Sequence, residues 1–165
     1  MLEIAIDRAI TLCYNRLKLI NYQKDRFMKI STKGRYALCV MLDIARNGSN
    51  EEYIPLAMIA ERQEMSKKYL ESILVVLVKE GFLEGVRGKG GGYRLTKRPE
   101  EYTVGSILIP VEDSLSPVAC ISSDSHRCQG TECCTARRVW SGLDKVIYDY
   151  LNSMTLADLL KDSAR

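Results

Sequence analysis

Histidine is almost absent from this chain: His126 is the only one among 165 residues. The scarcity argues against hydrolytic catalysis, because that chemistry commonly relies on a histidine paired with a carboxylate as general base. The Gly-x-Ser-x-Gly turn that exposes a nucleophilic serine is missing as well. We therefore expect a protein that is not an enzyme.

Long apolar runs are also missing. The chain has no stretch of about 18 uncharged apolar residues, the length that a membrane-spanning helix requires. Near the N-terminus, Glu3, Asp7 and Arg8 interrupt the apolar residues, and no small-residue cleavage site follows, which is unlike a signal peptide. The sequence predicts a cytoplasmic protein without a membrane partner.

Charge is distributed unevenly along the chain. The net charge is +3, but residues 28–98 carry 13 Lys and Arg against 8 Asp and Glu, whereas residues 99–165 carry 6 against 10. A basic segment followed by an acidic one indicates that the first binds a polyanion and that the second has another role. The hydrophobic fraction of 46% suffices for a packed core.

Three regions are predicted from these patterns. Residues 1–27 form a weakly amphipathic extension, and Met28 directly precedes a segment that reads as the start of a domain. The extension is either an over-extended start or loosely packed tail, or a helix that packs on the domain or on a partner. Residues 28–98 are the expected DNA-binding domain. Residues 99–165 are expected to hold a linker, a cysteine-bearing loop and a dimerisation helix.

The predicted fold is mainly α with a small β-hairpin. Apolar residues at three- and four-residue spacing predict helices over 31–47, 56–61 and 67–79. Two short alternating runs flank the glycine-rich segment 88–92 and predict a β-hairpin. Three helices followed by a hairpin are the plan of a winged helix-turn-helix.

The second half is predicted to be helical except around its cysteines. A short helix is expected over 104–109, and residues 114–134 show no apolar periodicity. A long helix is expected over 135–153, with apolar residues along one face. Such a face at the end of a small domain needs a partner. A last short helix over 156–160 would be capped by Thr155.

A winged helix places its third helix in the DNA major groove and its wing against the backbone or minor groove. Ser66 would cap that helix, whose N-terminus favours phosphate. Glu71 could accept from a cytosine amino group and so discriminate between bases, and Arg87 could enter a narrow minor groove. The predicted DNA-binding residues are Lys33, Arg35, Tyr36, Ser66, Lys67, Lys68, Tyr69, Glu71, Ser72, Arg87, Gly88, Lys89 and Gly90.

Other interpretations of these residues remain open. Any single lysine could belong to a solvated face, and the glycine-rich segment could be an ordinary hairpin. A Walker phosphate loop is excluded because no Gly-Lys-Ser/Thr follows at the required spacing. A dinucleotide-binding loop requires a following helix, whereas residues 93–96 are predicted as a strand.

Three cysteines lie in the segment without apolar periodicity. Seven residues separate Cys120 from Cys128, and five separate Cys128 from Cys134. These gaps match neither a zinc-ribbon pair nor a Cys-x-x-Cys redox motif. Thiolates suit zinc or an iron–sulfur cluster, and three of them leave one position for another ligand. The candidates for that position are His126, Cys133, Asp124, Glu132 or a residue of a partner subunit.

The alternative for the three cysteines is a set of free, oxidisable thiols. A solvated loop position is equally open for His126. Cys13 and Cys39 are interpreted as bystanders, and Cys39 is expected in the core because it lies on the first helix.

Four motifs resemble the Rrf-two family of winged-helix regulators, over residues 28–160. They are Met28-Lys29-Ile30-Ser31-Thr32-Lys33-Gly34-Arg35-Tyr36-Ala37, Ser66-Lys67-Lys68-Tyr69-Leu70-Glu71, Val86-Arg87-Gly88-Lys89-Gly90-Gly91-Gly92-Tyr93 and Thr155-Leu156-Ala157-Asp158-Leu159-Leu160. The resemblance implies a homodimer joined by the helix at 135–153 and recognition of palindromic double-stranded DNA. It also implies that the three cysteines bind an iron–sulfur cluster. It supports Met28 as the natural start.

The chain departs from the family at the fourth cluster ligand. Arg137 stands where the family's cluster-assembly regulators have a ligand histidine, and Arg35 stands where its nitric-oxide sensors use an aspartate. The hypothesis is a regulator that senses cluster status, iron, nitric oxide or redox state. The alternative is a cluster-free regulator that responds to thiol oxidation or a protein partner. A small redox protein is disfavoured by the basic segment 28–98.

Overall fold

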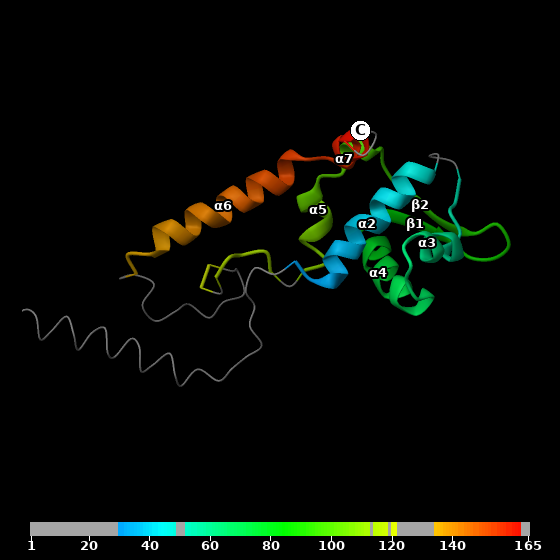
Figure 1. The fold of residues 1–165 in the computed structure, drawn as a ribbon, viewed down its shortest axis with the longest axis horizontal. Coiled ribbons are helices and arrows are strands. Elements are labelled where there is room, and N and C mark those ends of the chain that lie inside the picture. Colours follow the sequence, from blue (N-terminus) through cyan, green and yellow to red (C-terminus); the bar gives the residue numbers. More distant parts are fainter. Residues whose placement is uncertain (1–29, 49–51, 113, 119, 122–133, 163–165) are drawn as a thin grey trace, which may run out of the picture.

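The computed structural model is a helical body that carries a β-hairpin and a long projecting helix (Figure 1). It describes residues 30–48, 52–112, 114–118, 120–121 and 134–162. The elements are α2 (Thr32–Asn47), α3 (Leu56–Arg62), α4 (Lys67–Lys79), β1 (Leu83–Val86), β2 (Gly92–Leu95), a 3-10 turn (Pro99–Glu101), α5 (Val104–Leu108), α6 (Arg137–Ser153) and α7 (Leu156–Asp162). The extension over residues 1–27 lies outside the described residues.

The first helix, α2, is bounded as predicted. The Ser31 hydroxyl oxygen caps it by accepting from the Gly34 N–H at 3.0 Å, and the helix ends at Asn47. Caps of this kind contribute about 1 kcal/mol. The buried face supplies much of the core through Ala37, Val40, Met41 and Ile44.

Cys39 is exposed, so its predicted place in the core is wrong. The reason is helical periodicity. Two residues beyond Ala37, a side chain points about 200° around the helix axis and therefore away from the core-facing stripe. Membership of an amphipathic helix alone did not decide which face Cys39 occupies.

The next two helices make the predicted helix-turn-helix. The chain turns after α3 through Glu64, which adopts the left-handed region at φ 51°. Ser66 then caps α4, whose buried stripe joins the core, and Gly81 ends that helix with φ 73°. A glycine in this conformation is the common stop signal of a helix. The buried stripe of α4 consists of Leu70, Ile73, Leu74 and Leu77.

The hairpin is antiparallel, with Leu83 opposite Leu95 and Val86 opposite Gly92. Ile54, which lies outside both strands, forms an isolated β-bridge with Tyr93 in the half of the hairpin nearer the turn. Ile54 and Tyr93 exchange backbone hydrogen bonds of 2.9 Å in both directions. A Cβ on Gly92 would lie 2.2 Å from the Ile54 carbonyl oxygen, so only glycine permits this approach.

The segments after the hairpin share the same core. Tyr102, Ile107 and Leu156 are almost fully buried in one cluster with the residues of α2 and α4. Thr103 and Thr155 form a β-bridge that ties α5 to α7. Thr155 caps α7 together with Asp158, as expected. Among the described helices, none is long and apolar enough to cross a membrane.

Helix α6 begins two residues later than predicted and has no buried residue along its length. It projects from the α5 and α7 end of the body, away from α4 and the hairpin (Figure 1). Five of its exposed apolar side chains form one stripe, which we call the α6 stripe, whereas exposed Tyr148 lies on the opposite side of the helix. The α6 stripe consists of Val139, Trp140, Leu143, Val146 and Tyr150.

Candidate nucleic-acid interface and cysteine segment

The first turn of α4 presents an exposed, basic and acid-free surface. Lys67 and Lys68 are exposed, and the turn contains no acidic residue. The Ser66 hydroxyl oxygen accepts from the Tyr69 N–H at 3.3 Å. Positive side chains at the positive end of a helix dipole attract phosphate. Glu71 and Ser72 follow on the exposed side, and the Ser72 hydroxyl donates to the Tyr69 carbonyl oxygen at 2.6 Å.

Two predicted DNA contacts join α2 to α4. The rings of Tyr36 and Tyr69 meet edge to face, with centroids 5.9 Å apart and planes at 84°. Both side chains are half-buried and pack against the core. They therefore hold the second turn of α2 against the first turn of α4. Arg35 is exposed, with its guanidinium 6.0 Å from the Tyr36 ring centroid, and Lys33 is half-buried.

A buried carboxylate fixes the helix-turn-helix. Asp43 on α2 is only 7% exposed and accepts from Arg62 twice, at 2.8 Å from Nε and 2.6 Å from Nη2. The Gln63 amide, in the turn before α4, also donates to this carboxylate at 3.3 Å. The hydrogen bond to Asp43 raises the pKa of Arg62. Sequence reasoning missed this network, since Asp43 lies at the edge of the apolar stripe and carries no motif.

The wing is exposed at its tip and braced at its base. Arg87, Gly88, Lys89 and Gly90 are all exposed, and both glycines have positive φ, at 104° and 82°. Left-handed φ values of this kind are the reason for glycine in a tight turn. The predicted tip residues therefore lie together at the end of the hairpin.

At the base of the wing, Glu84 accepts from the Tyr53 hydroxyl at 2.8 Å and from Arg94 Nη2 at 2.9 Å. The Arg94 guanidinium also lies 4.6 Å from the Tyr53 ring centroid. Hydrogen bonds from Tyr53 and then Arg94 lower the pKa of Glu84, and the bond to Glu84 raises the pKa of Tyr53. These three residues carry no sequence motif and were not predicted. Glu84 and the Tyr53 ring together hold the Arg94 side chain at the base of the hairpin.

The cysteine segment, residues 120–134, is described only at its two ends, residues 120–121 and Cys134. Cys120 is half-buried, Cys134 is exposed, and both are free thiols. Cys128 lies outside the described residues, together with the four candidate fourth ligands His126, Cys133, Asp124 and Glu132. Within the part of the chain that the structure describes, no three His, Cys, Asp or Glu side chains gather into a metal site. Arg137 is exposed at the start of α6.

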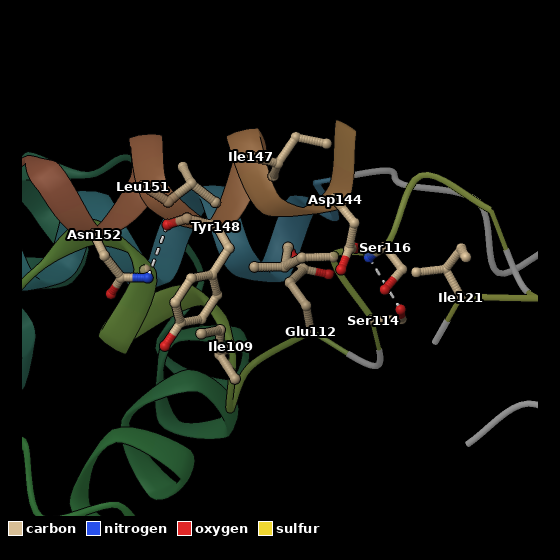
Figure 2. Close-up of a pocket in the computed structure, with 12 residues that line it drawn as sticks. Ile109, Glu112, Ser114, Ser116, Ile121, Asp144, Ile147, Tyr148, Leu151 and Asn152 are labelled. Atoms are coloured by element: carbon tan, nitrogen blue, oxygen red, sulfur yellow. Dashed lines mark hydrogen bonds between the residues drawn. The ribbon is translucent and has the colours of Figure 1, made fainter. Parts of the chain in front are cut away.

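A cleft of about 410 Å³ separates α6 from the segment that leads to Cys120. Figure 2 shows Glu112 facing this cleft, together with Asp144 and Tyr148 from α6. Its walls are Gly105, Ile109, Glu112, Ser114, Leu115, Ser116, Ile121, Asp144, Ile147, Tyr148, Leu151 and Asn152.

Glu112 also reaches the first helix of the DNA-binding region. Its Oε1 atom accepts from the Ser31 N–H at 2.9 Å and from the Ser31 hydroxyl at 3.1 Å. The first turn of α2 contains no acidic residue of its own. Glu112 therefore supplies the negative charge that stabilises this helix N-terminus. Sequence reasoning missed the contact, which joins residues 81 positions apart.

The comparisons with known proteins agree with this fold. Residues 30–162 match the model of the Rrf2 family, described as an iron-dependent transcriptional regulator. The HTH-type transcriptional regulator IscR of Erwinia tasmaniensis is 41% identical over 135 residues, covering 82% of this chain and 80% of the relative. IscR of Vibrio campbellii is 40% identical over 136 residues, which cover 82% of this chain and 79% of that relative.

Solved structures show the same architecture. T. potens IscR is 37% identical with a TM-score of 0.64, and the match covers 82% of this chain and 88% of that one. CymR (YrzC), the global cysteine regulator of B. subtilis, is 32% identical with a TM-score of 0.66, and the match covers 82% of this chain and 98% of that one. The family model spans the helix-turn-helix, the wing, the cysteine segment and α6 together. This chain belongs to the Rrf2 family of DNA-binding transcriptional regulators.

Proposed function

We propose that this regulator places α4 in the major groove of its DNA and lays the wing against the neighbouring backbone or minor groove. The observation that carries the proposal is the first turn of α4, which is exposed, bears Lys67 and Lys68 and lacks acidic residues. Lysines there would neutralise phosphates and release counterions. Glu71, exposed one turn further on, is suited to accept from a base amino group.

The wing and α2 would complete the contact. Arg87 and Lys89 flank a glycine at the exposed tip, where the backbone can approach DNA closely. Lys33, Arg35 and Tyr36 lie on the first two turns of α2, next to α4 through the tyrosine pair. Tyr69 and Ser72 would contribute from α4, although Tyr69 is also committed to packing. The remaining predicted contacts are Ser66, Gly88 and Gly90.

The protein is proposed to act as a homodimer on a palindromic operator. The α6 stripe supports this, since Val139, Val146 and Tyr150 are 62–63% exposed on one face of a single helix. An apolar face of this kind is stabilised when a second copy covers it. Two-fold symmetry of the dimer would be matched by palindromy of the DNA.

The three cysteines are proposed to hold an iron–sulfur cluster. The donor set fits that group, because thiolates are its usual ligands and the two described members, Cys120 and Cys134, are free and accessible. Cys128 would be the third ligand, and a fourth would come from elsewhere. The cluster would supply sensitivity to iron supply, nitric oxide or oxidation, and the regulator would report that state through its DNA affinity.

A cluster-free regulator of the same fold is the second candidate. The structural similarity to the CymR proteins favours it, and one of those neighbours is described as an oxidised form from Staphylococcus aureus. In this candidate the exposed thiols would themselves respond to oxidation, or a protein partner would provide the signal.

DNA binding is tested by fluorescence anisotropy with a duplex from the chain's own promoter region. The variants Lys67→Ala and Lys68→Ala should each weaken DNA binding. The slope of the logarithm of the binding constant against the logarithm of the salt concentration should become shallower by about 0.9 for each lost phosphate contact. Lys145→Ala is the control, since this exposed lysine lies on α6 and pairs with Asp149. If all three variants and the wild type show the same slope, the first turn of α4 does not contact the DNA phosphates and the proposal is wrong.

The cluster is tested by anaerobic reconstitution of Cys128→Ala beside Cys39→Ala. The Cys128 variant should lose iron, sulfide and visible colour, whereas the Cys39 variant should retain them because its exposed thiol lies on α2. Unchanged iron and sulfide in Cys128→Ala would refute the ligand assignment. A wild type that stays colourless would favour the cluster-free candidate.

A further inference from the structure

We propose that Glu112 is a positioning residue for DNA recognition, through which the cysteine segment and the DNA-binding helices are coupled. The inference rests on the proposed function because it assumes that α2 and α4 face DNA. It goes beyond that function by assigning the connection to one carboxylate outside both the predicted DNA contacts and the cysteines.

The first argument is that Glu112 takes a place that is normally filled from within the helix. In a capping box, the third helical residue is a glutamate whose side chain reaches back to the N–H of the capping residue. Here the third residue of α2 is Gly34, and the Ser31 N–H donates instead to Glu112, at 2.9 Å. The Ser31 hydroxyl still caps the helix, but the carboxylate half of the capping box is supplied by a segment distant in sequence.

Gly34 leaves the space that the Glu112 carboxylate occupies. A Cβ at that position would lie 1.9 Å from Glu112 Oε1, so any side chain would displace the carboxylate. Gly34 is itself buried on α2. Since glycine weakens a helix interior by about 1 kcal/mol relative to alanine, its presence here fits the need to admit Glu112.

The second argument is the position of Glu112 between two structural elements. On one side it contacts Ser31 at the start of α2, and on the other it lines the cleft beneath α6 (Figure 2). Its own N–H is anchored on the Leu108 carbonyl oxygen at the end of α5, at 3.0 Å. The chain runs from Glu112 through seven residues to Cys120. Movement of that segment therefore acts directly on the cap.

From Ser31 the connection continues to the DNA surface. Tyr36, on the second turn of α2, packs edge to face on Tyr69 in the first turn of α4. A shift of the α2 N-terminus is thus passed to the helix end that bears Lys67 and Lys68. Because coupling between two sites is reciprocal, DNA bound at α4 must in turn alter the segment beyond Glu112.

Hydrogen exchange measured by mass spectrometry tests this reciprocity in the cluster-free full-length protein. Exchange is compared with and without a duplex from the chain's own promoter region. In the wild type, the duplex should protect peptides from α4 and also slow exchange across residues 114–121, by about fivefold, the lower end of typical coupling between sites. In Glu112→Ala, the protection of α4 should persist and that of residues 114–121 should disappear.

Two further variants separate coupling from general loosening. Glu112→Gln keeps an oxygen that can accept from Ser31, so it should restore most of the protection over residues 114–121. Glu100→Ala removes an exposed carboxylate from the 3-10 turn and should behave as the wild type.

The outcomes are distinguishable. If DNA protects α4 but leaves residues 114–121 unchanged, or protects them equally in Glu112→Ala, the coupling role is overturned while the DNA-binding proposal stands. If α4 itself gains no protection in the wild type, the proposed interface fails and the inference fails with it. Loss of protection confined to residues 114–121 in Glu112→Ala supports the inference.

Discussion

Removal of the Asp43 carboxylate should destabilise the helix-turn-helix more than any surface substitution. The variant Asp43→Ala abolishes two hydrogen bonds from Arg62 and one each from Gln63 and Asn47, whose side chains come from α3, the following turn and the end of α2. Hydrogen bonds to charged groups contribute about 1.5–3 kcal/mol, and removal of one partner of a buried ion pair costs about 3–5 kcal/mol.

The Arg62 side chain is 29% exposed and can regain water after the substitution, whereas the Asp43 side chain is only 5% exposed. The cost therefore lies at or below the lower end of the range for a buried ion pair, and we expect a loss of about 2–3 kcal/mol in the free energy of unfolding. Urea unfolding followed by circular dichroism at one fixed protein concentration measures it, because an associating protein has a concentration-dependent stability.

A double-mutant cycle with Arg62→Ala isolates the pair. We expect the combined variant to be less destabilised than the sum of the single variants, with a coupling energy of about 1–2 kcal/mol. A single-variant loss below about 0.5 kcal/mol, which is typical of an unremarkable surface site, would refute the reasoning. Strict additivity would show that the two side chains do not stabilise each other.

Three further predictions address the wing, α6 and the α2 cap. Arg87→Ala should weaken DNA binding by about 1–3 kcal/mol while leaving the unfolding midpoint unchanged, since Arg87 is exposed at the hairpin tip; unaltered anisotropy titrations at fixed salt would exclude it from the interface. Val146→Asp places a charge in the α6 stripe and should shift analytical ultracentrifugation profiles from dimer to monomer, whereas Ser141→Asp, at an exposed position opposite the α6 stripe, should not. Gly34→Ala should displace Glu112 and so reproduce the exchange pattern of Glu112→Ala, with a net stability change within about 1 kcal/mol because the gain in helix propensity offsets the lost cap; preserved coupling in this variant would contradict the close contact.

The helices and the hairpin were predictable because their signals are local. Ser31 and Ser66 precede regular apolar stripes, and Gly81 follows one, so caps and periodicity located α2 and α4 to within a residue. Local signals were weaker at the start of α6, where Ala136 offers no side-chain cap. Cys39 was misplaced because its helix was recognised but its face was not worked out.

The side-chain contacts that position the site were not predictable in the same way. Glu112 reaches Ser31 across 81 residues and Thr103 reaches Asn152 across 49, and neither pair belongs to a motif. Such pairings arise only when the whole chain is folded. The division of the chain at residue 98 stays a prediction, as do the individual DNA contacts and the cysteine ligands.

The exposed residues of the proposed interface were selected from the sequence because their chemistry is unusual for their position, and their contact with DNA stays a prediction. Two lysines after a helix cap and an arginine beside a glycine turn have few structural reasons to be there. Tyr36 and Tyr69 illustrate the opposite case. Each was predicted to contact DNA, and each is half-buried because its ring packs against the other. A residue that packs can still contact DNA, but its loss would change both properties together.

Two close contacts hold the C-terminal end of α6 against the start of α5. Thr103 donates to Asn152 at 2.9 Å, and a Cβ on Gly105 would come within 2.6 Å of the same amide oxygen. Helix α6 has 17 residues and is therefore about 25 Å long. A tilt of about 5° at Asn152 would displace the far end by roughly 2 Å over that length. In the proposed dimer built on α6, the close packing of Asn152 on Gly105 would thus bear on the separation of the two copies of α4, and with it on the half-site spacing that the DNA must provide.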